Sequence, residues 1–335
     1  MKFGLINNYL LFGGGDLLLK IALYLKSRNY GMCVITSERH FSEKLKFLNE
    51  CTLGESLEMN SIKYLISEKV SEDDRVIGYI SKSTIGLSFG AAWIFKKKFI
   101  DLFKGKLLNL HGSRLPFDGG GGGFSWRIMR GDKLGISLIH QIQPGIDTGD
   151  IIDYEHYVFP QNCKIPIDFY KISNENYFEF MKSFLMKIDE KVDFSFKAQP
   201  EYLSMYWPRL NTDVHGYINW FNNVDDIDKF ICAFDDPYDG AITYLNGNEV
   251  RIKKVAAMKT EGIFHPFQSG IIYRVNDGIA MVAANSGALI IKEILNENRE
   301  NIIFSLRIGD RLYTPSEKIE NAFRHRAIYT PIGVK

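Results

Sequence analysis

Features that would place a chain outside the ordinary soluble class are scarce in this sequence. No apolar run approaches the roughly 20 residues that a membrane-spanning helix needs, so we expect no membrane span. The four cysteines are scattered without a C-x-x-C pair, which argues against a metal knuckle or a disulfide framework and favours a reducing cytoplasm. Glycines at 13–15 and Lys20 interrupt the apolar N-terminal stretch, and no small-residue cleavage pattern follows, so we expect no signal peptide.

An excess of either charge is also missing. The chain carries 41 Lys and Arg against 40 Asp and Glu, a formal net charge of +1, so no global basic field favours nucleic acid. Local basic patches remain possible. A hydrophobic fraction of 45% and a charged fraction of 24% are typical of a soluble globular protein. At 335 residues the chain is long enough for two domains.

The first part of the chain alternates predicted strands with predicted helices. The strands are expected at residues 2–7, 30–36, 75–80, 84–89 and 107–111. The helices are expected at residues 16–29 (with Asp16 as the N-cap), 41–48, 57–67 (with Ser56 as the N-cap), 93–103 and 167–189. This alternation predicts an α/β domain with a mostly parallel sheet, in which ligands bind beyond the carboxyl ends of the strands.

The second part of the chain has a different texture. After a predicted helix at 225–234, short alternating runs occur at residues 241–245, 249–255, 270–275, 279–284 and 288–294, and turn residues separate them. This spacing favours a small β barrel or sandwich, followed by a helix near 316–326 and an extended tail at 329–334. We therefore predict domains at 1–192 and 208–335, joined by a linker at 193–207.

One stretch, residues 106–153, carries the strongest indication of a functional site. Because side chains alternate along a strand, Asn109 and His111 share one face of the predicted strand at 107–111. Apolar runs at 136–142 and 150–153 flank Asp147. Two strands and their loops could therefore bring Asn109, His111 and Asp147 together at one edge of the sheet.

These three residue types suit acyl or formyl transfer to an amine. Asn can donate a hydrogen bond to a developing oxyanion, and His can accept a proton from the attacking amine. Asp can orient the imidazole or handle a proton on the leaving group. The alternative, that Asn109 and His111 only satisfy backbone groups at a strand end, stays open on residue types alone.

Two glycine runs have competing interpretations. Gly119–Gly123 fits a loop where backbone approaches a ligand or where the loop moves, and also a floppy surface connection. Gly13–Gly15 lacks the G-x-G-x-x-G pattern, so a tight strand-to-helix turn is favoured over a dinucleotide-phosphate site. From its position alone, His140 is interpreted as a structural histidine.

Two motifs resemble a known family. Residues 109–116, NLHGSRLP, resemble the N-x-H-x-S-x-L-P signature of folate-dependent formyltransferases. Residues 144–152, PGIDTGDII, are similar to the family's second signature, G-h-D-T-G-D-h-h, where h is apolar. Residues 206–220 and the β-rich part resemble nucleotide-sugar N-formyltransferases that have a C-terminal domain like that of methionyl-tRNA formyltransferase.

The resemblance implies a Rossmann-like N-terminal domain, an OB-like C-terminal barrel and N10-formyltetrahydrofolate as the formyl donor, without a metal. It implies Asn109, His111 and Asp147 as the catalytic residues. The residues that it implies for donor binding are Ser88, Phe89, Gly90, Ala91, Leu115, Pro116, His140 and Ile142. Those assigned to the acceptor are Ser113, Arg114, Gly119 and Gly120.

The acceptor side departs from the family pattern. Gly119 stands where the family has Arg, Gly123 where it has Pro, Arg114 where an apolar residue or Pro is usual, and Leu138 where Thr is common. These changes leave the predicted catalytic residues intact but put acceptor binding in doubt.

The favoured hypothesis is a cytoplasmic sugar N-formyltransferase that acts on the amine of a dTDP- or UDP-linked amino-deoxy sugar, of the kind used in lipopolysaccharide and O-antigen. We expect no nucleic-acid or membrane partner, and a homodimer is possible. The main alternative is methionyl-tRNA formyltransferase, but residues 35–50, where such enzymes carry a basic insertion, are short and mixed in sign. Hydrolysis of the formyl donor and non-catalytic folate binding are further alternatives.

Overall fold

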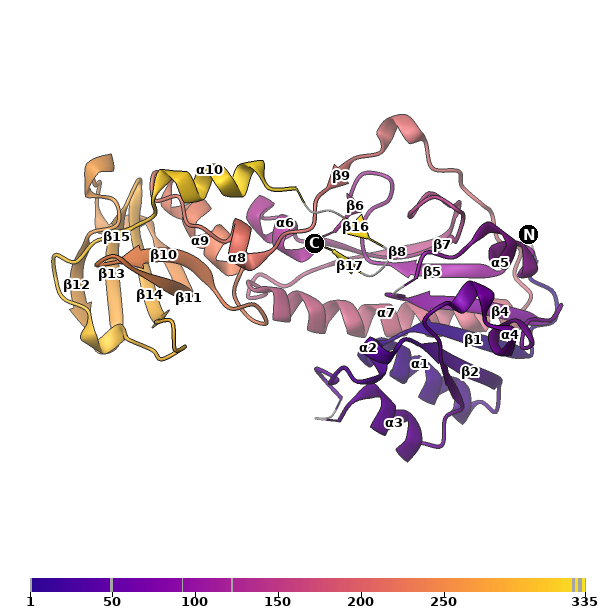
Figure 1. Cartoon of the computed structure of the whole chain (residues 1–335). Coiled ribbons are helices and arrows are strands. Elements are labelled where there is room, and N and C mark those ends of the chain that lie inside the picture. Colours follow the sequence, from indigo (N-terminus) through magenta and orange to yellow (C-terminus); the bar gives the residue numbers. More distant parts are fainter. Residues whose placement is uncertain are drawn as a thin grey trace. The chain divides into compact units, whose positions relative to one another are not determined.

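A computed structural model describes residues 2–48, 51–91, 93–121, 123–326, 329–330 and 333–334 (Figure 1). The chain forms two compact units, and each unit is built from three segments that are separated in the sequence. The first unit comprises Met1–Gly119, Leu134–Val158 and Lys171–Tyr206, and the second comprises Gly120–Lys133, Phe159–Tyr170 and Trp207–Lys335. The domain limits expected at 192 and 208 stay predictions.

The first unit is built on a seven-stranded sheet with the order β3-β2-β1-β4-β5-β7-β8. Its strands are β1 (Asn8–Gly13), β2 (Gly31–Thr36), β3 (Tyr64–Ile66), β4 (Thr84–Phe89), β5 (Leu107–His111), β7 (Leu134–Gln141) and β8 (Ile151–Val158). The first five are parallel, whereas β7 and β8 are antiparallel to their neighbours. The predicted α/β class with a mostly parallel sheet is confirmed.

Both faces of this sheet are buried. The helices of the first unit are α1 (Gly15–Ser27), α2 (Glu38–Phe41), α3 (Leu53–Met59), α4 (Asp74–Ile77), α5 (Lys97–Leu102) and α7 (Pro166–Asp189), with short 3₁₀ turns η1 (Val70–Glu72) and η2 (Glu201–Leu203). Only the part of α7 from Lys171 onward belongs to this unit. Tyr9 and Leu11 of β1 pack in one cluster with Phe184 of α7, while Phe12 packs on the other face with Phe99. Alternation along β1 thus supplies both layers of the core.

Three N-terminal predictions were displaced or wrong, although the helix expected at 16–29 and the strand expected at 30–36 are confirmed as α1 and β2. The first strand is β1 and not residues 2–7, and Gly14, not Asp16, is the N-cap of α1. The Asp16 carboxylate instead accepts hydrogen bonds from the backbone N–H groups of Lys46, Phe47 and Leu48, at 3.0, 2.8 and 3.1 Å. Because their N–H groups bond to Asp16, these residues turn and do not continue the predicted helix at 41–48.

Local capping explains two of the other errors. The helix expected at 57–67 begins at Leu53, where Thr52 and Glu55 form a capping box, and residues 64–66 are strand β3. The strand expected at 75–80 is helix α4, because the Asp73 side chain accepts a hydrogen bond from the Arg75 N–H. The helix expected at 93–103 is only α5.

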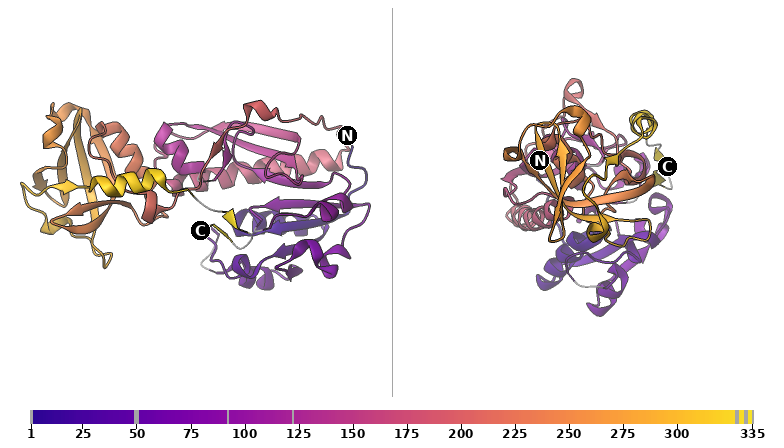
Figure 2. Two further views of the ribbon diagram at one scale, coloured as in Figure 1. Left: turned by 45° about the horizontal axis from the view of Figure 1, so that its top comes forward. Right: turned by 90° about the vertical axis from the view of Figure 1, so that its left-hand side faces the viewer.

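The second unit contains a six-stranded antiparallel sheet that curls as a half-barrel (orange in Figure 2). Its strands are β10 (Ala241–Leu245), β11 (Asn248–Met258), β12 (Ile272–Asn276), β13 (Ile279–Ala284), β14 (Gly287–Leu295) and β15 (Leu312–Tyr313). Its helices are α6 (Gly123–Arg130), α8 (Thr212–His215), α9 (Val224–Ala233) and α10 (Ser316–Arg324), with 3₁₀ turns η3 (Lys259–Glu261), η4 (Pro266–Gln268) and η5 (Ile303–Ser305). The predicted OB-like β domain is confirmed. None of the helices in the described part of the chain combines the length and apolar character that crossing a bilayer requires.

Two short ladders complete the fold. Strand β6 (Gly119–Gly120) pairs with β9 (Tyr206–Trp207), and β16 (Tyr329–Thr330) pairs with β17 (Gly333–Val334). Gly120 has a φ of +97°, and a Cβ there would lie 2.2 Å from the Trp207 carbonyl oxygen, so only glycine fits. The start of the glycine run is therefore held by a ladder and is no floppy connection. Gly122 and parts of the predicted tail (327–328 and 331–332) lie outside the described residues.

Candidate active site

Strand pairing places the first residues of the site. In the antiparallel register of β5 and β7, Asn109 lies opposite His140 and His111 lies opposite Leu138. On the other side of β5, Asn109 is in register with Ser88, near the carboxyl end of β4. These side chains therefore gather at the edge where parallel α/β sheets bind ligands.

Asp147 reaches the same place on the loop after β7. Its φ of +55° is a left-handed conformation that non-glycine residues seldom adopt without support. The Gln199 side-chain amide supplies that support, because its Nε2 donates to the carbonyl oxygens of Asp147 and Gly149, at 2.8 and 2.6 Å. The Gln141 N–H donates to the Asp150 carbonyl at 2.9 Å and closes the loop.

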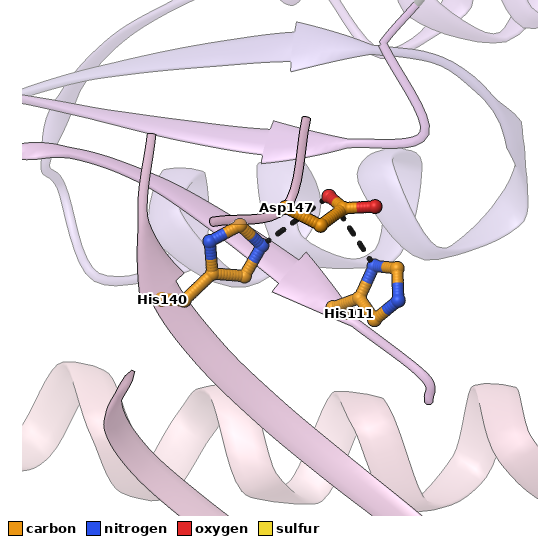
Figure 3. A group of neighbouring side chains, drawn as sticks. All are labelled: His111, His140 and Asp147. Carbon is orange, nitrogen blue, oxygen red and sulfur yellow. Dashed lines mark ion pairs between the residues drawn. The ribbon is translucent and has the colours of Figure 1, made fainter. Parts of the chain in front are cut away.

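Asp147 lies between two imidazoles (Figure 3). Its Oδ1 is 3.7 Å from His111 Nδ1 and 3.6 Å from His140 Nε2. Both distances exceed the range of a good N–H···O bond, so these contacts are mainly electrostatic in this geometry. The side chain of His140 is 2% exposed, that of His111 17% and that of Asp147 24%. His140 is therefore buried, whereas His111 and Asp147 remain accessible.

His140 fixes the orientation of Asn109. The His140 Nδ1 lies 2.8 Å from the Gln141 carbonyl oxygen, which can only accept, so Nδ1 carries the proton. The Nε2 lone pair is then free to accept from Asn109 Nδ2 at 3.1 Å. The second N–H of Asn109 stays available for a ligand. The structure thus places His140, first interpreted as structural, among the predicted catalytic residues.

Burial sets the protonation of His111 and Asp147. Burial and the neighbouring His140 lower the pKa of His111, although Asp147 acts in the opposite direction. Burial would raise the pKa of Asp147, but the two imidazoles outweigh it and hold this pKa below its ordinary value. Within the part of the chain that the structure describes, the buried His111 Nε2 has no hydrogen-bond partner. At neutral pH the site therefore holds a neutral imidazole, able to accept a proton, beside a carboxylate.

The two imidazoles and the Asp147 carboxylate lie close enough together to be considered as ligands of a metal ion. One ligand atom from each of His111, His140 and Asp147 lies within 4.8 Å of the others, and imidazole and carboxylate are zinc ligands. However, Asn109 already occupies the Nε2 of His140, so a metal there would have to displace that hydrogen bond. The absence of a metal from the chemistry stays a prediction.

The residues predicted for donor binding lie at strand ends and in adjoining loops. Ser88 and Phe89 are buried at the end of β4, and Gly90 and Ala91 follow them. Ile142 follows β7, and its N–H donates to the Leu107 carbonyl at 2.9 Å. Leu115 packs with Ile136 and Leu138, and the peptide bond to Pro116 is cis. Their roles in binding stay predictions.

The residues predicted for the acceptor already have partners within the protein. Arg114 Nε is 2.9 Å from Asp118 Oδ2, and the Ser113 carbonyl accepts the Leu115 N–H. The Gly119 N–H donates to the Met205 carbonyl at 3.1 Å, and Gly120 belongs to the same ladder. These residues therefore make contacts that stabilise the local fold, and their contact with an acceptor stays a prediction.

Sequence reasoning missed two residues that shape the site. Gln199 lies in a stretch expected to be a linker, and no local pattern links it to Asp147. Tyr177 of α7 places its hydroxyl only 1.9 Å from where a Cβ of residue 112 would lie, which explains the glycine after His111. Gly112 in the signature was the only sequence signal of this contact, and a glycine alone does not reveal that Tyr177 is its neighbour.

The electrostatics predict how His111 titrates. In an NMR titration, with His111→Gln used to assign the signal, His111 should titrate with a midpoint below about 6.5, the ordinary value for histidine. Because the unfolded chain binds this proton more readily, acidification through that window should also lower the free energy of unfolding. A midpoint above 6.5 would contradict the buried, neutral imidazole.

Two parts of the chain match models of a known family. Residues 11–162 match the family described as "Formyl transferase", and residues 212–303 match "Formyl transferase, C-terminal domain". The methionyl-tRNA formyltransferase of Syntrophus aciditrophicus is 26% identical over 238 residues, which are 71% of this chain and 70% of that protein. That of Clostridium tetani is 25% identical over 236 residues, 70% of this chain and 74% of that protein.

Solved structures share the fold. An N-formyltransferase from Helicobacter canadensis, in complex with folinic acid and dTDP-3-aminofucose, has a TM-score of 0.63 at 21% identity and covers 86% of this chain and 98% of its own. A sugar 3N-formyl transferase, with dTDP and a formyl-tetrahydrofolate, has a TM-score of 0.64 at 20% identity over 88% and 99%. A methionyl-tRNA formyltransferase from Clostridium thermocellum reaches 0.50 at 17% identity over 76% and 96%. With both family domains present in order, the chain belongs to the formyl transferase family.

Proposed function

We propose that this protein is a sugar N-formyltransferase that moves the formyl group of N10-formyltetrahydrofolate to the amine of a nucleotide-linked amino-deoxy sugar. The observation that carries the proposal is the cluster at the sheet edge, where neutral His111 faces the Asp147 carboxylate and the Asn109 amide bonds to His140. The site needs no hydroxyl or thiol nucleophile, because the amine of the acceptor is itself the nucleophile.

The first half of the reaction forms the new bond. The amine lone pair attacks the formyl carbon, and the carbonyl oxygen becomes an oxyanion. The second N–H of Asn109, which His140 leaves free, is available to donate to that oxyanion. Neutral His111 takes the proton that the attacking nitrogen releases, and the Asp147 carboxylate stabilises the resulting imidazolium.

The second half returns the proton. When the bond between the formyl carbon and N10 of the folate breaks, N10 keeps the electron pair and must gain a proton. The proton held by the His111–Asp147 pair balances this step, so the site ends in its starting state. Because the pKa of Asp147 lies below its ordinary value, its side chain is an ionised carboxylate before the reaction. It therefore holds and relays the proton released by the amine and does not supply a proton of its own.

The similar structures support the donor and the acceptor class. The two sugar-acting neighbours, solved with folate compounds and with dTDP or a dTDP-sugar, are covered over 98% and 99% of their chains, with TM-scores of 0.63 and 0.64. The structure that acts on methionyl-tRNA reaches only 0.50. The formal net charge of +1 also offers little long-range attraction to tRNA.

Methionyl-tRNA formyltransferase remains the second candidate, because the curated relatives carry that name at 26% and 25% identity. Both candidates use the same donor and the same attack by an amine. They differ in the partner that presents the amine, so acceptor tests decide between them.

A panel of acceptors is the direct test. Full-length protein is supplied with N10-formyltetrahydrofolate and, one at a time, dTDP- and UDP-linked 3-amino and 4-amino sugars and methionyl-tRNA. We expect one nucleotide-linked amino sugar to gain a formyl group, detected by mass spectrometry. His111→Asn should reduce turnover on that acceptor by roughly 10²–10⁴-fold, because the proton acceptor is lost.

Several outcomes would contradict the proposal. Formylation of methionyl-tRNA alone, with salt-sensitive binding, would establish the second candidate. Release of formate without an amine would indicate a hydrolase. A His111→Asn protein with wild-type turnover would remove the assigned role of this histidine.

The support of Asp147 by Gln199 gives a separate prediction. Gln199→Ala removes both hydrogen bonds to the Asp147 loop, so kcat should fall roughly 10-fold while KM for the donor changes little, because orientation and not binding is lost. Gln161→Ala, at an exposed position, is the matched control. Equal effects of both variants on kcat, or an effect of Gln199→Ala on KM alone, would contradict the positioning role.

A further inference from the structure

A cavity of about 470 Å³ lies wholly within the residues of the second unit. Its size is in the range of small-molecule sites. It is lined by segments around Asn219, the turn at 266–269, strand β15 and the start of α10. None of these residues belongs to the site around His111, so the cavity requires its own explanation.

Ser269 is the first indication of a ligand. Its side chain lines the cavity and is 9% exposed, and its Oγ is buried with no hydrogen-bond partner among the described residues. Leaving a buried hydroxyl unpaired is energetically unfavourable, because its hydrogen bonds to water are lost and not replaced. A ligand atom that bonds to the hydroxyl would remove that cost.

Arg311 supplies a cation at the same cavity. Its Nη2 donates to the Phe267 carbonyl at 2.7 Å, and its guanidinium carbon lies 5.0 Å from the centre of the Phe267 ring. These contacts hold the guanidinium in place but use one of its five N–H donors. The remaining donors suit a phosphate, whose geometry the planar fork matches.

Exposed aromatic rings border the cavity. Phe221 is 74% exposed and Phe267 is 75% exposed, although both rings line a concave site. Phenylalanine at such positions commonly stacks on the face of a nucleobase. Ring faces beside a fixed guanidinium therefore match a base linked to phosphate.

Two further polar side chains complete the lining. The Asn219 Oδ1 accepts the Phe221 N–H at 3.1 Å, which leaves its NH₂ group to donate. The carboxylate of Glu320 is 3.2 Å from Arg324, which offsets its repulsion of an anion. Its second oxygen is suited to a sugar hydroxyl or a base N–H.

From these features we infer that the cavity is a second binding site, for a free nucleoside diphosphate. The base stacks on the exposed phenyl rings, and Arg311 holds the phosphates. The Ser269 hydroxyl bonds to a polar atom of the ligand. This inference concerns a site distinct from the one that transfers the formyl group and does not depend on the identity of the acceptor.

Calorimetric titration of the full-length protein with dTDP, UDP and ADP, without formyl donor, tests the inference. We expect saturable binding of at least one of them that Arg311→Ala and Phe267→Ala each weaken 10-fold or more. The matched variants Arg307→Ala and Phe304→Ala, at exposed positions outside the cavity, should bind as the wild type does. Formyl transfer by all four variants should match the wild type, which separates this site from the catalytic one. Ser269→Ala, a smaller change, should also weaken binding.

Other results would overturn the inference. These are an absence of binding by all three nucleotides, or binding that Arg311→Ala and Phe267→Ala leave unchanged. Binding of a single-stranded RNA oligonucleotide, but not of free nucleotides, through the same residues would assign the cavity to RNA instead. Thermal unfolding of each variant, measured in parallel, identifies any loss that comes from misfolding.

Discussion

The hydrogen bond between Asn109 and His140, across β5 and β7, is the contact on which the site depends. It exists because β7 runs antiparallel to β5 in a register that sets the two residues opposite each other. The Gln141 carbonyl fixes the proton of His140 on Nδ1, and this in turn fixes which way the Asn109 amide points. The same strand ends in the loop that returns Asp147 to the edge, where Gln199 holds its left-handed backbone. One strand pairing thus orients an oxyanion donor and delivers a carboxylate.

The electrostatic state of the site follows from that arrangement. His111 is buried enough to stay neutral, while Asp147 remains ionised because two imidazoles face it. Proton transfer to His111 then creates an ion pair where none existed, and the carboxylate stabilises the charge that appears as the amine attacks. A fully exposed pair would gain less, because water would screen it. Partial burial, with Asp147 24% exposed, leaves room for the donor and the acceptor.

Much of the first unit could be predicted from sequence, since buried parallel strands such as β4 and β5 are rich in apolar residues and carry site residues near their carboxyl ends. Some of the failed predictions come from local capping, by Thr52 with Glu55 and by Asp73. Others come from side chains that bond to backbone groups far away in the sequence. Asp16 turns residues 46–48, which no helical pattern within 41–48 reveals, and Gln199 supports a loop 50 residues earlier in the chain. Likewise Gly120 is required by the Trp207 carbonyl, so the glycine run was visible but its partner was not. Antiparallel strands of the second unit, bounded by turn residues, were predicted well because their pairing is local.

The central claim is that His111 accepts the proton of the attacking amine under the influence of Asp147. The pH dependence of kcat/KM for formyl transfer, measured for the wild type and for Asp147→Asn, tests it most directly. The carboxylate raises the pKa of His111 against burial, so its removal should move the acidic limb of the profile to lower pH while lowering the plateau. An acidic limb at the same pH in both proteins would contradict the account, because the titrating base would then not be the histidine beside Asp147.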